Sequence, residues 1–193
     1  MQSIQTVSEN TIYVGASDRR LAKFENLFPI PRGVSYNAYV ILDEKTALLD
    51  TADASVGAQF LENVAAALDG RKLDYLIVDH MEPDHAAMIE AVLVRWPDLR
   101  LVVNAKTLPM LKMYFPTDSA AIDDALVVKE GDTLDLGKHK LTFVMAPMVH
   151  WPEVMMTFDT TTGTLFSADA FGTFGALEGA LFADEVDFAG KWL

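Results

Sequence analysis

The stretch His80-Met81-Glu82-Pro83-Asp84-His85 places four side chains that can bind a metal close together in the sequence. It follows an apolar run over residues 73–78, typical of a short strand, and precedes a helical pattern over residues 85–96. Pro83 disfavours helical backbone at Glu82, so the chain there should be extended, and alternate side chains should point to one side. The pattern therefore predicts a metal site between the end of a strand and the start of a helix.

The last two residues of this stretch have a structural as well as a chemical interpretation. His85 begins the predicted helix and can reach the same point as the residues before it. We expect Asp84 to cap that helix, because a carboxylate accepts hydrogen bonds from the free N–H groups of a first turn. A single histidine or aspartate at a strand end is usually a solvated loop residue. The whole pattern H-x-E-x-D-H, by contrast, should arise by chance in only about one such chain in a few thousand.

Two further candidate ligands lie downstream, each just past the end of a predicted strand. His150 follows the strand at residues 139–145, and Asp169 follows the strand at residues 164–168. A rigid sheet can hold such side chains in place as ligands. His139 differs, because it lies between two lysines whose charges disfavour a metal, and we interpret it as a surface residue.

Together the candidate ligands comprise three imidazoles and three carboxylates: His80, His85, His150, Glu82, Asp84 and Asp169. These are too many donors for one tetrahedral zinc ion, and they suit two metals that share a bridging carboxylate. The chain has no cysteine, which excludes disulfides, thiolate zinc sites, iron–sulfur clusters and cysteine nucleophiles. Imidazole and carboxylate donors without thiolate favour a hard ion such as iron or manganese.

The rest of the sequence alternates short β-branched runs with amphipathic runs. A β-rich start leads into a β-α-β-α middle and a β-rich continuation, which suits sheets packed on each other and covered by helices. A doubly wound sheet is disfavoured, because the second half has too few helices to cover both faces. We expect a single domain over residues 1–193. Strands are predicted over residues 36–42, 46–50, 73–78, 101–103, 125–128, 133–136, 139–145, 154–159 and 164–168, and helices over residues 55–69, 85–96 and 106–114.

The net charge of the chain limits the classes of molecule that it is expected to bind. The 193 residues include 15 basic and 28 acidic side chains, which gives a net charge of −13. Nucleic acids and anionic lipids attract basic surfaces, so we expect neither as a partner. The sequence has no apolar run of roughly 18 residues that would predict a transmembrane helix, and its first residues do not form a secretory signal. We therefore predict a cytoplasmic protein.

The motifs resemble those of the diiron domain of the flavodiiron proteins, also called A-type flavoproteins. That family combines H-x-E-x-D-H with a later histidine and a still later aspartate. Here 64 residues separate His85 from His150 and 18 separate His150 from Asp169, which are the spacings of the family. The resemblance runs from about residue 10 to the end of the sequence. It includes the surrounding motifs at residues 33–39, 46–51, 150–152 and 167–172.

The resemblance implies a metallo-β-lactamase-like fold, a four-layer αββα sandwich of the α/β class. It also implies three roles for the candidate ligands: one iron held by His80, Glu82 and His150, a second held by Asp84 and His85, and a bridge made by Asp169. In the broader superfamily, mostly zinc hydrolases, a histidine stands where Glu82 does. A carboxylate stabilises the higher oxidation state of iron, so Glu82 favours redox chemistry over hydrolysis.

In the family this centre reduces dioxygen to water or nitric oxide to nitrous oxide, and both substrates stay open here. Electrons come from FMN in a fused flavodoxin-like domain, usually on the neighbouring subunit of a head-to-tail dimer. No flavodoxin-like segment is visible in this sequence. We therefore expect that the chain binds no FMN, and that a flavodoxin-like domain or a rubredoxin-type donor supplies the electrons.

The end of the sequence differs from the family pattern. The family has a further ligand histidine some sixty residues after the bridging aspartate, whereas this sequence ends 24 residues after Asp169. We therefore expect a C-terminally incomplete sandwich whose second metal lacks one ligand. The last segment is also apolar, with Phe171, Phe174, Leu177, Leu181, Phe182, Phe188 and Trp192. An open sheet edge beside this segment predicts a homodimer or another oligomer rather than a monomer.

Two other functions stay open. One is a non-catalytic diiron module that binds or senses oxygen, or an inactive fragment, in agreement with the lack of a flavin domain. The other is a zinc-dependent hydrolase on the same fold, against which Glu82 argues. Metal analysis separates the hydrolase from the diiron alternatives, and a reduced flavodoxin or rubredoxin separates a reductase from a sensor.

Overall fold

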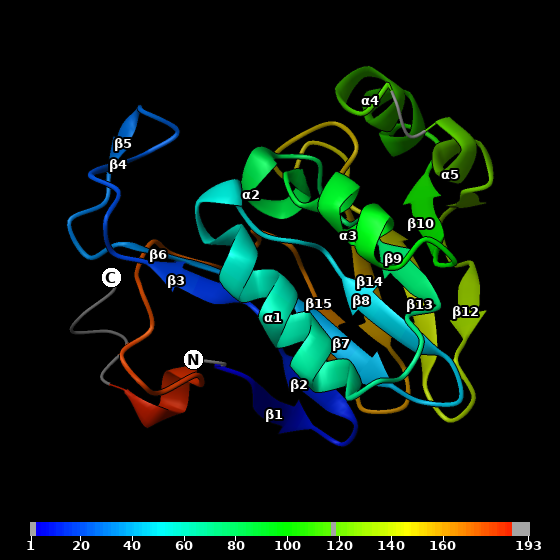
Figure 1. Ribbon diagram of the computed structural model, residues 1–193, viewed down its shortest axis with the longest axis horizontal. Coiled ribbons are helices and arrows are strands. Elements are labelled where there is room, and N and C mark those ends of the chain that lie inside the picture. Colours follow the sequence, from blue (N-terminus) through cyan, green and yellow to red (C-terminus); the bar gives the residue numbers. More distant parts are fainter. Residues whose placement is uncertain (1–2, 117–118, 187–193) are drawn as a thin grey trace.

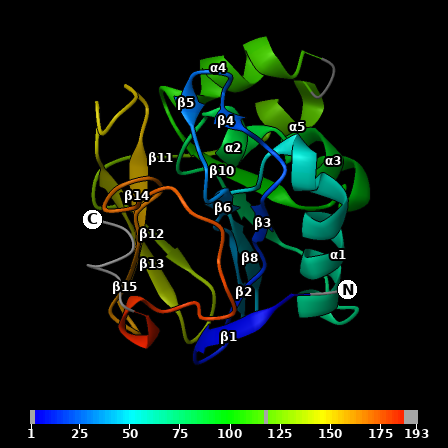
Figure 2. The same ribbon diagram turned by 90° about the vertical axis from the view of Figure 1, so that its left-hand side faces the viewer.

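Two β-sheets face each other in the computed structural model, which describes residues 3–116 and 119–186 (Figure 1). The larger sheet has seven strands in the order β1-β2-β7-β8-β9-β10-β11, and the smaller sheet has four, β12-β13-β14-β15. Strands β8 to β11 pair in parallel, and the other neighbours in both sheets pair antiparallel. Helices cover one face of the larger sheet, and the smaller sheet lies against the other face (Figure 2).

The larger sheet contains β1 (Gln5–Ser8), β2 (Thr11–Tyr13), β7 (Tyr39–Leu42), β8 (Thr46–Leu49), β9 (Tyr75–Ile77), β10 (Arg100–Asn104) and β11 (Leu126–Val128). The smaller sheet contains β12 (Thr133–Asp135), β13 (Lys140–Met145), β14 (Met155–Asp159) and β15 (Thr164–Phe166). Two short pairs are separate from these sheets: β3 (Ala16–Asp18) with β6 (Val34–Tyr36), and β4 (Lys23–Phe24) with β5 (Phe28–Pro29). The helices are α1 (Gly57–Leu68), α2 (Pro83–Ala86), α3 (Ile89–Arg95), α4 (Thr107–Tyr114) and α5 (Ser119–Asp123), with short 3-10 turns at η1 (Ala54–Val56) and η2 (Ala183–Glu185).

The central strands of the larger sheet are buried on both faces, because alternate side chains point to opposite sides. The helix side of the sheet carries Leu48, Leu76 and Leu101, while the side facing the smaller sheet carries their neighbours Leu49, Ile77 and Val102. Both sets of side chains are almost completely buried. This double burial explains why these strands are continuous apolar runs in the sequence, without the polar alternation of a half-exposed sheet.

The layered sandwich that the resemblance implies is confirmed, with its helix layer on the larger sheet. In the described ranges no helix covers the outer face of the smaller sheet, where Val144 and Leu165 are exposed. Strand β15 forms one edge of that sheet. Of the apolar segment predicted after residue 170, Phe188 and Trp192 lie outside the described residues. None of the helices in the described part is both long and apolar enough to cross a membrane.

The helix predicted over residues 85–96 is interrupted, and a contact from a distant residue explains the break. The carbonyl of His85 accepts hydrogen bonds from the backbone N–H and the hydroxyl of Thr51, at 2.8 and 2.6 Å. The backbone N–H of Met88 donates to the same hydroxyl at 3.3 Å. Thr51 therefore competes for bonds that a continuous helix would form, and the chain forms α2 and α3 instead.

Other boundaries differ from the prediction for similar reasons. The strand predicted over residues 36–42 is divided between β6 and β7, which pair with different neighbours. Helix α5 was not predicted, and its last residue, Asp123, forms an ion pair with Lys112 at 2.7 Å. Strands β6 and β7 depend on pairing partners elsewhere in the chain, which local patterns do not specify.

The prediction that His139 lies on the surface is wrong. Its side chain is buried, and its Nδ1 lies 2.8 Å from Oδ2 of Asp159. Its backbone N–H donates to Oδ2 of Asp43 at 2.6 Å. The two flanking lysines point to solvent, while the histidine between them faces the core, as alternation along an extended chain requires. The pair therefore connects β13, β14 and the turn after β7.

We predict that His139→Ala lowers the free energy of unfolding by about 3 kcal/mol, because it leaves the buried carboxylate of Asp159 without its histidine. Chemical unfolding in urea, followed by circular dichroism, measures the change. Lys138→Ala is the matched control, since it removes only an exposed ion pair with Glu9 and should change stability by less than about 1 kcal/mol. Equal stabilities of the two variants would contradict the prediction.

Candidate metal centre

The six candidate ligands come together at one end of the sandwich. The loop after β9 carries His80 and Glu82, and α2 carries Asp84 and His85. Two further loops complete the site: the loop between β13 and β14 carries His150, and the loop after β15 carries Asp169. They form two overlapping groups that could hold a metal ion, and the ligand atoms in each lie within 4.8 Å of one another. The groups are His80, Glu82, His150 and Asp169, and Asp84, His85 and Asp169.

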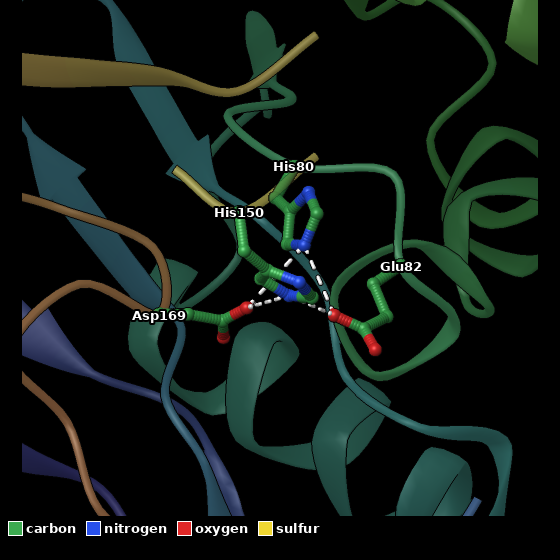
Figure 3. Close-up of side chains that lie close together, drawn as sticks. All are labelled: His80, Glu82, His150 and Asp169. Atoms are coloured by element: carbon green, nitrogen blue, oxygen red, sulfur yellow. Dashed lines mark hydrogen bonds and ion pairs between the residues drawn. The ribbon is translucent and has the colours of Figure 1, made fainter. Parts of the chain in front are cut away.

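In the first group two imidazoles and two carboxylates point at one another (Figure 3). Oε2 of Glu82 lies 2.7 Å from Nε2 of His150 and 3.1 Å from Nε2 of His80. Oδ2 of Asp169 lies 3.1 Å and 3.3 Å from the same two nitrogens. Four donor atoms from three separate loops therefore surround one point, as the ligands of a metal ion do.

The second group uses the other oxygen of Asp169. Its Oδ1 lies 2.7 Å from Nε2 of His85, and Oδ2 of Asp84 lies 3.7 Å from that nitrogen. Oδ1 of Asp84 is buried and has no hydrogen-bond partner among the described residues. A buried carboxylate oxygen without a partner is costly for a folded protein, and a cation beside it would remove that cost. The two oxygens of Asp169 face the two groups, which is the geometry of a bridging carboxylate.

The local backbone is as predicted at Glu82 and differs at Asp84. Glu82 is extended, with φ −60° and ψ 145°, and Pro83 begins α2 directly after it. The prediction that Asp84 caps this helix is wrong, because the position before the helix belongs to Glu82 and no side chain caps the helix there. Asp84 lies one residue into the helix, and its side chain is free to face His85.

Sequence reasoning missed three buried carboxylates behind the ligands. Oδ2 of Asp50 lies 3.0 Å from Nδ1 of His85, and Oε1 of Glu153 lies 2.8 Å from Nδ1 of His80. Asp79 donates its backbone N–H to Oδ1 of Asp50 at 2.7 Å. The sequence does contain a feature that could have identified two of them. Asp50 and Asp79 each directly follow an apolar strand, as the candidate ligands do. Acidic residues are rarely buried without a partner, so such positions call for a neighbouring cation or histidine.

The charges within the centre shift the pKa values of its groups strongly. Burial alone would lower the pKa of His80, but hydrogen bonds to Asp169, Glu153 and Glu82 outweigh it and raise that pKa to about 11. Burial likewise opposes the hydrogen bonds of His85 to Asp169 and Asp50, which raise its pKa to about 10. Without metal, protons on these imidazoles therefore balance the carboxylates.

The carboxylates show the complementary effect. Burial tends to raise the pKa of Asp169, but the hydrogen bonds from His80 and His85 outweigh it and hold that pKa well below its usual range. Burial raises the pKa of Asp84 to about 6. The donor set thus attracts positive charge at two neighbouring points, and its imidazole and carboxylate atoms, with no thiolate, could hold metal ions there.

A cavity of about 440 Å³ opens onto this centre and has an aromatic wall. Phe24, Phe28 and Phe174 line it together with the candidate ligands. The ring centroids of Phe24 and Phe174 are 5.0 Å apart, and those of Phe28 and Phe174 are 6.5 Å apart. A small apolar molecule can enter such a cavity and contact these rings.

Comparison with known proteins agrees with this geometry. The model of the family described as "ODP family beta lactamase" matches residues 34–191. The anaerobic nitric oxide reductase flavorubredoxin of Klebsiella pneumoniae is 38% identical over 183 residues, which are 94% of this chain and 37% of that protein. The chain thus spans little more than a third of the length of such relatives.

Solved structures show the same fold. The flavodiiron protein of Giardia intestinalis superposes with a TM-score of 0.91 at 28% identity, over 98% of this chain and 45% of that one. Rubredoxin oxygen:oxidoreductase of Desulfovibrio gigas superposes with a TM-score of 0.90 at 30% identity, over 97% and 46% of the two chains. The resemblance to flavodiiron proteins that the motifs indicated is confirmed.

Proposed function

The chain belongs to the ODP family of beta-lactamase domains, and on that premise we propose that it is the diiron core of a flavodiiron-type oxidoreductase. The reaction we assign is the reduction of dioxygen to water, of nitric oxide to nitrous oxide, or of both. The observation that carries the proposal is the donor set, in which Glu82 completes the first group and Asp169 directs one oxygen to each group. A hydrolytic zinc site has no need of the added carboxylate of Glu82, because zinc does not change its oxidation state.

We assign the ligands as the distances suggest: His80, Glu82 and His150 to one iron, Asp84 and His85 to the other, and Asp169 to both. An iron pair bound there would pass electrons from a donor to a diatomic substrate and would offer binding positions for it. The three carboxylates offset the charge of the cations, and the histidines supply neutral donors once their protons have left. Phe24, Phe28 and Phe174 give the reacting molecule an apolar surface in the cavity.

The electrons must come from a separate group, and the loops around the centre offer a surface for it. Apolar side chains stand exposed on three segments near the ligands: Leu27 and Phe28, Met148 and Val149, and Phe171, the last with 86% of its surface accessible. We propose that an FMN-carrying, flavodoxin-like domain or a rubredoxin-type donor docks here. The single-domain organisation, the cytoplasmic location and the pairing of the chain with itself or another chain stay predictions.

The proposed function is tested with the chain loaded anaerobically with ferrous iron. With a reduced flavodoxin or rubredoxin present, we predict consumption of nitric oxide or dioxygen well above the rate of the same amount of free iron. The chain alone should retain no FMN after purification, and with NADH alone it should consume dioxygen no faster than free iron does. An electrode for each gas and the absorption spectrum of flavin give these readings.

Two results would contradict the proposal. A chain that retains only zinc and hydrolyses esters or thioesters would be a hydrolase on this fold. A chain that binds two iron ions and takes up dioxygen, but is not turned over by any reduced donor, would be a sensor or a storage module instead.

A further inference from the structure

Glu153 is a buried carboxylate that lies directly behind one of the proposed ligands. It comes just before β14, and only 1% of its surface is exposed. Its Oε1 accepts from the backbone N–H of Met81 at 3.0 Å and faces Nδ1 of His80 at 2.8 Å. The side chain thus connects the smaller sheet to the loop that carries His80 and Glu82.

The backbone of Glu153 is held from the other side by the larger sheet. Its carbonyl accepts from Nδ2 of Asn104 at 2.6 Å, at the end of β10. Oδ1 of Asn104 in turn accepts from the backbone N–H groups of Lys106 and Thr107, at 2.8 and 3.1 Å, so the amide itself is fixed. The side chain of Glu153 therefore has little conformational freedom. Because Glu153 is held by β10 and lies just before β14, it fixes the imidazole of His80 relative to both strands.

The charge of Glu153 is largely uncompensated except through His80. Oε2 of Glu153 is buried and has no hydrogen-bond partner in the described part of the chain. A buried carboxylate with an unpaired oxygen destabilises the fold unless a positive charge lies close by. On the far side of the His80 ring, Nε2 faces Glu82 and Asp169 at 3.1 and 3.3 Å, where the first metal position lies.

We propose that Glu153 is the positioning residue for the first iron, a role that rests on the proposed diiron function. Oε1 accepts a hydrogen bond from Nδ1–H of His80, which fixes the ring and leaves the Nε2 lone pair directed at the metal. The negative charge behind the ring increases the donor strength of His80 and offsets the charge of the iron.

The chain offers a matched control at the other end of the sandwich. Nδ1 of His139 lies 2.8 Å from Asp159, the same distance as between His80 and Glu153. Both pairs are buried. Among the residues described, however, the pair at His139 belongs to no group that could hold a metal. A substitution of Asp159 therefore reproduces the structural cost of losing a buried carboxylate without touching the centre.

The experiment compares the affinity of the 193-residue chain for ferrous iron in competition with a chromophoric chelator, without oxygen. Glu153→Ala should weaken the first iron roughly 10- to 100-fold, the usual cost of losing a carboxylate behind a ligand histidine. Glu153→Gln keeps an oxygen that accepts from Nδ1 but loses the charge. It should weaken binding less than Glu153→Ala and raise the midpoint potential of the iron. Asp159→Ala should lower stability and leave the iron affinity unchanged.

The proposal is overturned if Glu153→Gln binds iron with the wild-type affinity and potential, a comparison that stands even where Glu153→Ala does not fold. It is also overturned if Asp159→Ala weakens iron as much as Glu153→Ala does, since the effect would then be general destabilisation. Failure of the proposed function looks different: the wild-type chain would bind no iron, or would bind it and reduce neither gas. Equal affinities in an active wild type and its Glu153 variants would refute only the role of Glu153.

Discussion

Glu82→Ala is expected to lower the iron content from about two ions per chain to about one, and to abolish reduction of dioxygen and nitric oxide. Oε2 of Glu82 lies within 3.1 Å of both His80 and His150, so its loss opens the first group directly. Loss of a residue behind a ligand costs roughly 10- to 100-fold in metal affinity, and loss of a ligand itself should cost more. Metal analysis after anaerobic loading and desalting measures the result.

One neighbouring carboxylate has to be controlled in this experiment. Glu25 lies beside Glu82, and burial together with the charge of Glu82 raises the pKa of Glu25. Glu25→Ala alone should keep both irons, because Glu25 belongs to neither group of ligands. The double variant of Glu25 and Glu82 excludes substitution of one carboxylate for the other. Two tightly bound irons in the double variant would show that Glu82 is not a ligand.

Glu82→His extends the same experiment to the choice of metal. An imidazole at this position keeps a donor atom but removes a negative charge, and softer donors favour zinc over iron. We expect this variant to bind metal while its preference moves toward zinc. Loading with equimolar ferrous iron and zinc, followed by metal analysis, compares the preference with that of the wild type. An unchanged ratio would remove the chemical argument that separates this centre from a hydrolase.

Iron affinity is expected to rise steeply with pH, because the metal must displace protons from the two buried histidines. In the metal-free chain the pKa of His80 is about 11 and that of His85 is about 10, so both imidazoles are charged at neutral pH. Each proton released on binding makes the affinity roughly tenfold stronger per pH unit. Since His80 and His85 each release one proton, the binding of both irons together should become about a hundredfold stronger per pH unit. Chelator competition between pH 6.5 and 8.5 measures the slope for each iron.

The stability of the metal-free chain should move in the opposite direction. A histidine whose folded pKa lies above its ordinary value of about 6.5 stabilises the fold fully below that pH, and the contribution disappears as the pH rises through the folded pKa. The stability that the charged forms of His80 and His85 contribute is lost completely only above pH 10 to 11. Urea unfolding of the metal-free chain should therefore require less denaturant at pH 9.5 than at pH 6.5. If the iron affinity does not change between pH 6.5 and 8.5, and the stability of the metal-free chain does not change between pH 6.5 and 9.5, the charge state proposed for the two histidines is wrong.

The six candidate ligands could be named from the sequence alone, because local patterns mark those residues. The proline after Glu82 imposes an extended backbone, and the observed dihedral angles agree. His150 and Asp169 each lie in the loop after an apolar strand whose existence could be read from β-branched alternation. The layered order of strands and helices followed from the same periodicities, which depend on residues only a few positions apart.

Only the tertiary structure decided what lies behind the ligands and at the opposite end of the sandwich. Glu153 contacts His80 across 73 positions of the chain, and the break between α2 and α3 depends on Thr51, which accepts from Met88 37 positions away. His139 is buried because Asp159, 20 residues along, is carried by the neighbouring strand. Such pairs form when packing of the two sheets brings distant strand ends together. No local periodicity encodes that distance, so the candidate ligands could be named from the sequence, but the contacts of Glu153 with His80 and of Asp159 with His139 could not.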